Sequence, residues 1–184
     1  MNVGSITTNN PIGYEYRKTQ KADSAQSFAG SMKNVSGAMV VHGSNNEDGI
    51  AIGSSTDRSG SVAVYKPNGF DPANPVYKVK AWDAAGNVTE ERMVDISKVD
   101  PNSSDYLDMF AYSSHLTDSG ECPGAQEAFM KASFNQHGAG TVYDSYTDDM
   151  DWIGILKYAM QQQYDLGNLA GYAKYKQFWD FLEQ

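Results

Sequence analysis

Short apolar runs separated by turn-forming residues dominate the first half of the chain. The runs "GAMVVHG", "IAIGSS" and "SVAVYKP" are divided by "SNNEDG" and "TDRSG", which have the composition of loops. Apolar runs of this length between turn signals are typical of strands joined by hairpins. The pattern predicts an antiparallel β-meander over about residues 37–96.

The stretch "YKVKAWDAAGNVTEERMVDI", residues 77–96, predicts the last hairpin of that sheet. Tyr77, Val79 and Ala81 alternate with other side chains, which is the period of a half-buried strand, and "DAAGN" supplies the turn. Neither face of the return strand is cleanly apolar, so we expect this strand near a sheet edge. Opposite charges would then pair across the two strands, with Lys78 and Lys80 facing Glu90 or Glu91.

The periodicity becomes helical after about residue 100. A first helix is expected from Tyr106, capped by Asn102 or Ser103 and with Asp105 in its first turn. The segment "AQEAFMKASFN" predicts a second, short helix.

Two further helices have the clearest apolar stripes of the chain. The first, in "DDMDWIGILKYAMQQQYDLG", has a stripe formed by Trp152, Ile155, Leu156, Ala159, Met160 and Gln163. Gly167 should end this helix and Asn168 should cap the next one. The stripe of that last helix is Leu169, Tyr172, Tyr175, Phe178, Trp179 and Leu182. We expect both stripes to form core.

Together these patterns predict an α+β fold, in which a small antiparallel β-meander packs against three or four C-terminal helices. Residues 36–184 would form this single domain. Residues 1–35 are rich in Ser, Thr, Asn, Gln and Lys, and they predict a polar N-terminal arm that is partly disordered or forms one short helix.

The net charge of −9 is carried almost entirely by the second half of the chain. Residues 1–100 have 10 Lys or Arg against 11 Asp or Glu, a net of −1, whereas residues 101–184 have 4 against 12, a net of −8. The second half also holds 15 of the 22 aromatic residues. Such an acidic surface argues against binding to nucleic acid or to anionic membranes.

The sequence shows no apolar run of about 18 residues, so no membrane span is expected. The polar start "MNVGSITTNNPIGYEYRKTQ" lacks the apolar region of a Sec signal peptide. The default prediction is a cytoplasmic protein. Export by a non-Sec route, or a signal peptide that has been removed, stays open.

The candidate catalytic residues are few and scattered. No histidine pair has the spacing of a helical zinc site, since the chain has only His42, His115 and His137. Ser114 precedes His115, but neighbours on a helix point about 100° apart and do not form a nucleophile–base pair. We expect His115 in a C-terminal helical turn, where the helix dipole favours its charge. The single cysteine, Cys122, is expected in a loop as an ordinary thiol.

The sequence predicts neither a metal nor a cofactor. Two acidic clusters, "NNEDG" at 45–49 and "DDMD" at 148–151, lack the EF-hand pattern, so a loop and a helix start are expected there. The glycines form neither the P-loop nor the dinucleotide-binding motif, and "HGAGTVYD" is expected to be a connector.

Aromatic residues that the core does not need are the best candidates for a contact surface with another protein. Tyr158, Tyr164 and Tyr172 are the residues expected on the outer faces of the last two helices. The leading hypothesis is therefore a non-catalytic binding or assembly protein. The alternatives are a hydrolase-like enzyme, whose site is assembled from scattered Asp, His and Ser residues, and an exported protein with an uncleaved polar N-terminal signal.

Two resemblances accompany these patterns. The hairpin "AWDAAGNVTE" resembles the last hairpin of bacterial immunoglobulin-like modules. A complete sandwich of that type needs about seven strands in roughly 100 residues, and only about 60 residues precede the helices here, so adhesin function is not carried over. The segments "MNVGSITTNN", "NPVYKVKAWDAAGNVTEERMVDISKVDP" and "DMFAY" look like a group of uncharacterised proteins from clostridial gut bacteria, which implies a bacterial origin.

Overall fold

Four antiparallel strands form one sheet in the order β1-β2-β3-β4. The strands are β1 (Ile50–Thr56), β2 (Gly60–Lys66), β3 (Val76–Asp83) and β4 (Val88–Asp95). The computed structural model describes residues 47–56, 60–138 and 146–184, without the side chains of residues 135–138. The predicted arm over residues 1–35 and the first apolar run lie outside the described residues.

The helices follow the sheet in the sequence. A short 3-10 turn, η2 (Ile96–Lys98), leads to α2 (Tyr106–Ser119), α3 (Ala125–Gly138), α4 (Trp152–Asp165) and α5 (Leu169–Leu182). This arrangement confirms the predicted α+β class with C-terminal helices. No helix in the described part of the chain combines the length and the hydrophobicity needed to cross a bilayer.

The two faces of the sheet have different roles because side chains alternate along each strand. Val64 of β2 and Val79 of β3 are fully buried in the main core, and they are paired across the two strands. On the opposite face the Lys80 ammonium lies 2.8 Å from one Asp48 oxygen and 3.3 Å from Glu91. The contact between Lys80 and Glu91 confirms the predicted pairing of opposite charges across the two strands. The return strand β4 is an edge strand, as its mixed pattern predicted.

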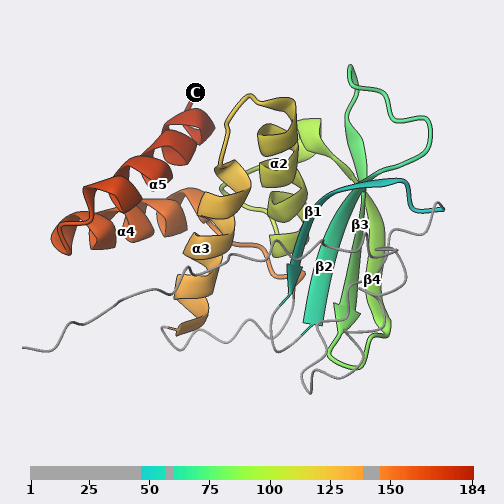
Figure 1. Cartoon of the computed structure of the whole chain (residues 1–184), viewed down its shortest axis with the longest axis horizontal. Helices are drawn as coiled ribbons and strands as arrows, with labels where there is room; N and C mark the ends of the chain where they lie inside the picture. Colours follow the sequence, from blue (N-terminus) through green and yellow to red (C-terminus); the bar gives the residue numbers. More distant parts are fainter. Residues whose placement is uncertain (1–46, 57–59, 139–145) are drawn as a thin grey trace, which may run out of the picture. The chain divides into compact units, whose positions relative to one another are not determined.

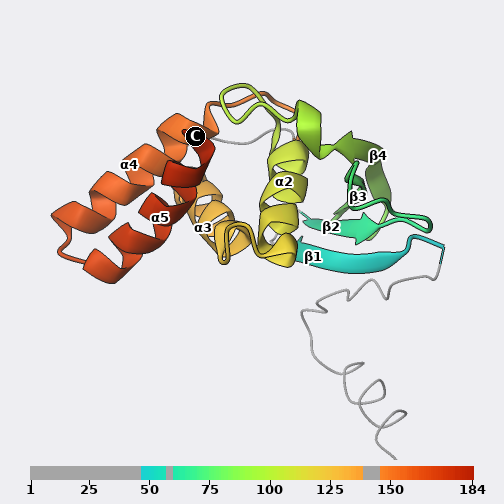
Figure 2. The same ribbon diagram turned by 90° about the horizontal axis from the view of Figure 1, so that it is seen from above.

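Helix α2 is the central element between the sheet and the other helices (Figures 1 and 2). The Phe110 ring of α2 packs on the Phe129 ring of α3, with 6.2 Å between the ring centroids. On the sheet side, His115 hydrogen-bonds Tyr77 of β3. A helix buried on two sides needs apolar residues around most of its circumference. In the sequence, helical spacing predicts one stripe for this segment, formed by Tyr106, Met109, Phe110, Ser113 and Leu116. This stripe underestimates the burial of α2, since Leu107 and Ala111 are also fully buried.

Strand β1 approaches the helices closely at Gly53. A Cβ atom built on Gly53 would lie 2.3 Å from the Gln126 side-chain nitrogen and 2.6 Å from the Ser114 hydroxyl oxygen. A larger residue would therefore require the Gln126 and Ser114 side chains to move. Glycine at this position therefore allows β1 to reach the junction of α2 and α3.

Helices α4 and α5 form an antiparallel hairpin on the far side of α3 from the sheet (Figures 1 and 2). Trp152, Leu156 and Phe178 are among its buried anchors, which confirms most of the two predicted stripes. Of the helices in the described residues, α2 alone makes extensive contact with the sheet. The packing is thus sequential: sheet, α2, α3 and then the hairpin.

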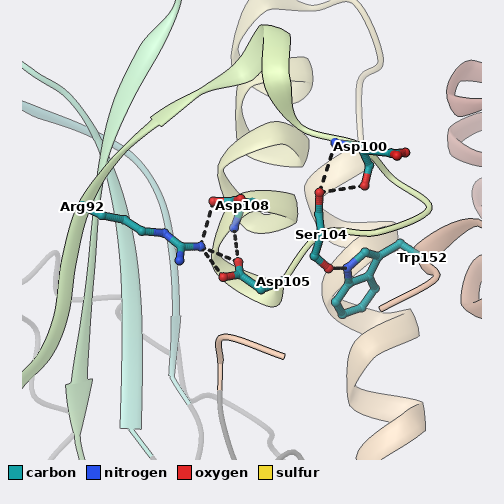
Figure 3. A network of polar contacts seen from close by, with 6 residues as sticks. All are labelled: Arg92, Asp100, Ser104, Asp105, Asp108 and Trp152. Atoms are coloured by element: carbon teal, nitrogen blue, oxygen red, sulfur yellow. Dashed lines mark hydrogen bonds and ion pairs between the residues drawn. The ribbon is translucent and has the colours of Figure 1, made fainter. Parts of the chain in front are cut away.

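The loop before α2 is bonded to the sheet by an ion-pair cluster (Figure 3). The Arg92 guanidinium of β4 bonds both carboxylate oxygens of Asp105, one of them at 2.6 Å, and reaches Asp108 at 2.7 Å. Burial and the nearby Asp105 charge raise the pKa of Asp108. Asp105 also caps α2, because its carboxylate accepts from the Asp108 backbone N–H at 2.9 Å. The predicted caps Asn102 and Ser103 are therefore wrong.

The same loop is bonded to the start of α4 (Figure 3). The Trp152 indole donates to the Ser104 carbonyl at 2.7 Å, and the Met150 backbone N–H donates to it at 3.1 Å. The Trp152 backbone N–H donates to the Pro101 carbonyl at 2.9 Å. Inside the loop, the Ser104 hydroxyl donates to the Asp100 carbonyl at 2.7 Å. We call residues 100–105 the clamp loop, because they join β4, α2 and α4.

The first prediction compares the indole rings of Trp152 and Trp179. Replacing Trp152 by Phe should destabilise the protein by about 1–3 kcal/mol in urea unfolding, because a buried hydrogen bond and indole packing are lost. Trp179 is the matched control, since its buried indole nitrogen has no hydrogen-bond partner in the described structure. Trp179→Phe should cost clearly less. Equal costs for the two substitutions would contradict a role for the indole–carbonyl bond.

A second prediction concerns Arg92. Arg92→Met should lower the free energy of unfolding by about 2 kcal/mol at pH 7, because it leaves two carboxylates facing each other without a cation. This cost is smaller than the ~3–5 kcal/mol typical of a fully buried pair. Adding Asp108→Asn should recover part of this loss, which a double-mutant cycle measures.

Lys98→Met is the control for the Arg92 series. Lys98 pairs with Asp95 at 2.9 Å, but 80% of its side chain is exposed. Such a surface pair contributes about 0–1 kcal/mol. A Lys98→Met cost as large as that of Arg92→Met would argue against the cluster as an anchor.

Candidate functional site

The end of the α4–α5 hairpin exposes several large apolar side chains. Leu166 is 79% exposed, Leu169 64% and Tyr164 58%. The Tyr164 ring contacts the Tyr172 ring of α5, with 5.8 Å between the centroids. We call these four residues, Tyr164, Leu166, Leu169 and Tyr172, the hairpin tip.

A tight turn holds the hairpin tip in place. Gly167 has a φ of 71°, which glycine adopts without strain, and its backbone N–H donates to the Tyr164 carbonyl at 2.9 Å. Asn168 caps α5, as predicted: its side-chain oxygen accepts from the Gly171 N–H at 3.1 Å, and its amide nitrogen donates to Gln163 at 2.6 Å. These bonds fix the backbone between the two leucines, so their side chains project from a defined turn.

The structure brings together two of the three tyrosines expected on the contact surface. Tyr164 and Tyr172 are ring partners. Tyr158 is 55% exposed, but it precedes Tyr164 by six residues. At roughly 100° per residue, this spacing places Tyr158 about 120° away around α4. Tyr158 is therefore not part of the hairpin tip.

The two leucines of the tip were not recognised as surface residues from the sequence. The predicted place of Leu169 in the core stripe of the last helix is wrong, because Leu169 is the first residue of α5 and is 64% exposed. Figure 1 shows that α5 begins at the end of the hairpin away from α3. A signal was present in "DLGNLAG", where two leucines flank the turn residues Gly167 and Asn168. Turns usually carry polar residues, so leucine at both ends is unusual.

A cluster of titratable side chains surrounds His115. The Tyr77 hydroxyl lies 2.8 Å from His115 Nδ1, and the Glu121 carboxylate lies 3.6 Å from Nε2. Burial lowers the pKa of His115, against the opposite effect of Glu121 and Asp118, and burial raises the pKa of Tyr77 to about 12. At neutral pH His115 is therefore a neutral partner of a protonated tyrosine. The predicted place of His115 in the last turn is wrong, because α2 continues to Ser119.

The serines beside His115 are not arranged as nucleophiles. The hydroxyls of Ser113 and Ser114 both donate to the Phe110 carbonyl, at 3.2 Å and 2.6 Å. Ser114 also accepts from the Gln126 amide at 3.2 Å. A serine nucleophile needs a base within hydrogen-bond reach of its hydroxyl, and here the bonded partners are backbone and amide groups.

The lone cysteine lies in the loop between α2 and α3, as predicted. Cys122 is 2% exposed, and burial raises the pKa of its thiol. The reactive form of cysteine is the exposed thiolate. This environment does not provide that form.

One described carboxylate of each acidic cluster has a structural partner. Asp48 accepts from Lys78 at 2.7 Å and from Lys80, and Asp151 caps α4 by accepting from the Gly154 N–H at 2.8 Å. Among the residues that the structure describes, no group of three or more His, Cys, Asp or Glu residues is placed to hold a metal ion. The predicted candidates His42 and the His137 side chain lie outside the described part.

Comparisons with known proteins give no family for this chain. No protein-family model matches it, and neither the curated proteins nor the solved structures contain a match.

The His115 environment generates a prediction for the pH dependence of stability. Because the folded pKa is lowered below the ordinary 6.5, the contribution of neutral His115 is present above about pH 6.5 and is lost as the pH falls through the lowered pKa. The stability difference between wild type and His115→Asn, measured by urea unfolding, should therefore shrink from pH 7 to pH 5. Tyr77→Phe, which keeps the histidine, should retain a steeper loss with acid than His115→Asn. A difference that is constant or grows towards pH 5 would contradict the lowered pKa.

Proposed function

We propose that this chain is a non-catalytic binding protein that docks a protein partner through the hairpin tip. The observation that carries the proposal is the pair of exposed leucines, Leu166 and Leu169, on a turn fixed by Gly167 and Asn168. Large apolar groups clustered on a surface are typical of protein interaction sites.

The chemistry of the tip indicates what kind of partner it would fit. Two leucines and two tyrosines give an apolar centre with hydroxyl groups, and tyrosine is enriched at binding hot spots. Two charged side chains of these helices have hydrogen-bond partners: Asp165 accepts from the neutral Gln161 amide at 2.8 Å, and Lys176 pairs with Asp180 at 2.6 Å. A convex helical end of this kind fits an apolar groove on a protein partner.

The turn geometry favours binding because it limits the entropy that association removes. Asn168 bonds both Gly171 and Gln163, so the backbone of the tip is ordered before a partner arrives. A preorganised surface loses less conformational freedom on binding than a flexible one. The hydrolase alternative has weaker support, since both serines next to His115 donate to a backbone carbonyl.

The test is a double substitution of the tip, Leu166→Ser with Leu169→Ser. Ile50→Ser is the matched control, because Ile50 is 70% exposed on β1. Tagged wild type, tip variant and control are each used to capture partner proteins from a lysate of the source cell. A captured partner is then purified, and its affinity for each of the three proteins is measured by titration. We expect the tip variant to bind at least about tenfold more weakly, since truncation of hot-spot residues costs more than about 1.4 kcal/mol.

The control should keep the wild-type affinity, and all three proteins should melt at the same temperature. Equal binding by the tip variant and wild type, equal loss in the control, or the lack of any partner that binds the purified chain would overturn the proposal.

A further inference from the structure

A concave site lies between α3, the end of β1 and the α4–α5 hairpin. It is a cavity of about 470 Å³, within the roughly 300–1,000 Å³ of sites that hold small molecules. Its described apolar lining is Tyr106, Met130, Phe134, Tyr146 and Tyr175. None of these residues belongs to the hairpin tip, so this site is argued independently of the proposed function.

The polar lining of the cavity consists mainly of uncharged groups. Its members are Ser55, Thr56, Lys131, Ser133 and Gln163. The one cation in this described lining, Lys131, forms an ion pair with Glu127 at 2.5 Å. Lys174 lies 3.1 Å from the same carboxylate. The cavity therefore offers aromatic surface and hydroxyl or amide groups, and its ammonium group already pairs with a carboxylate that it shares with Lys174.

These properties separate the ligand classes. A charged ligand would lose hydration, and an anion would have to compete with Glu127 for the Lys131 ammonium. A hydrocarbon would shield the hydroxyl and amide groups of the lining from water without offering them hydrogen bonds, which is costly in a desolvated site. A sugar ring has an apolar C–H face and an edge of hydroxyl groups, so it matches both parts of the lining. We propose that this cavity binds a short, uncharged saccharide.

Phe134 is the residue expected to stack on the sugar ring. It lies at the cavity but is 69% exposed, whereas Phe129, one and a half turns earlier on α3, is fully buried. An exposed phenylalanine at the mouth of a cavity contributes nothing to the core. It provides a flat apolar surface for the C–H face of a ligand.

The experiment uses maltose, cellobiose, lactose and N,N′-diacetylchitobiose as neutral probes. Glucuronic acid is the charged comparison, and N-acetyltyrosinamide stands for a peptide side chain. Saturation-transfer NMR detects binding to the full chain, and calorimetry gives the Kd. We expect at least one neutral disaccharide to bind, and Phe134→Ala to raise its Kd at least about fivefold through lost stacking.

Three variants make the outcome specific. Met93→Ala removes another exposed apolar side chain, 54% exposed on β4, and should leave the Kd unchanged. Lys131→Gln should change the Kd by less than about twofold, because the ammonium is held by Glu127. The Leu166→Ser, Leu169→Ser variant should bind the saccharide normally, which separates this site from the proposed partner surface.

Failure of all four disaccharides to bind would overturn the proposal. Stronger binding of glucuronic acid would overturn the neutral ligand class, and binding of N-acetyltyrosinamide alone would identify a peptide side-chain pocket instead. A saccharide that binds Phe134→Ala as tightly as wild type would show that the cavity is not its site.

Discussion

The clamp loop, residues 100–105, is the constraint on which the arrangement of the layers depends. On one side, Asp105 of the loop is bonded to Arg92 of the edge strand and caps α2. On the other side, the Ser104 carbonyl receives the indole and backbone donors at the start of α4. Six consecutive residues thus fix the angle at which α2 leaves the sheet and the point at which the hairpin begins. The end of the sheet at Asp95 and the start of α4 at Trp152 are far apart in the chain. They are held together by polar bonds of defined direction, in addition to the less directional packing of the core.

The position of the hairpin tip is a consequence of this attachment. The hairpin is anchored at its base, where Trp152 packs on Phe129 with 4.8 Å between the ring centroids, and its other end lies away from α3 (Figure 2). Apolar side chains at the base are therefore buried, and apolar side chains at the turn are not. The same helix pair provides a wall of the cavity through Gln163 and Tyr175. One element thus connects the proposed partner surface with the proposed saccharide site while keeping their side chains separate.

The titratable groups of the described structure are used mainly for bonding between elements. Arg92 connects β4 with the start of α2, and His115 connects α2 with β3. Asp48, which lies in a loop, accepts from two lysines of β3. Each of these side chains has at least one partner at hydrogen-bond distance. In the proposed binding role, recognition would depend on the hairpin tip, whose four side chains are leucines and tyrosines.

The sequence by itself determined the elements and their ends wherever a local pattern was sufficient. The alternation from Tyr77 onward, the stripe that includes Trp152 and Leu156, and the turn at Gly167 and Asn168 each identify a strand, a helix or a turn, because the signal lies within a few residues of the chain. Only the tertiary structure decided which apolar residues are covered. Leu169 has the spacing of a core residue but is exposed, and α2 is buried on two sides although one stripe was visible. The partners of Arg92, His115 and Ser104, and the ten side chains around the cavity, come from segments far apart in the chain. Burial and proximity depend on how whole elements pack against one another, and no local spacing of residues contains that information.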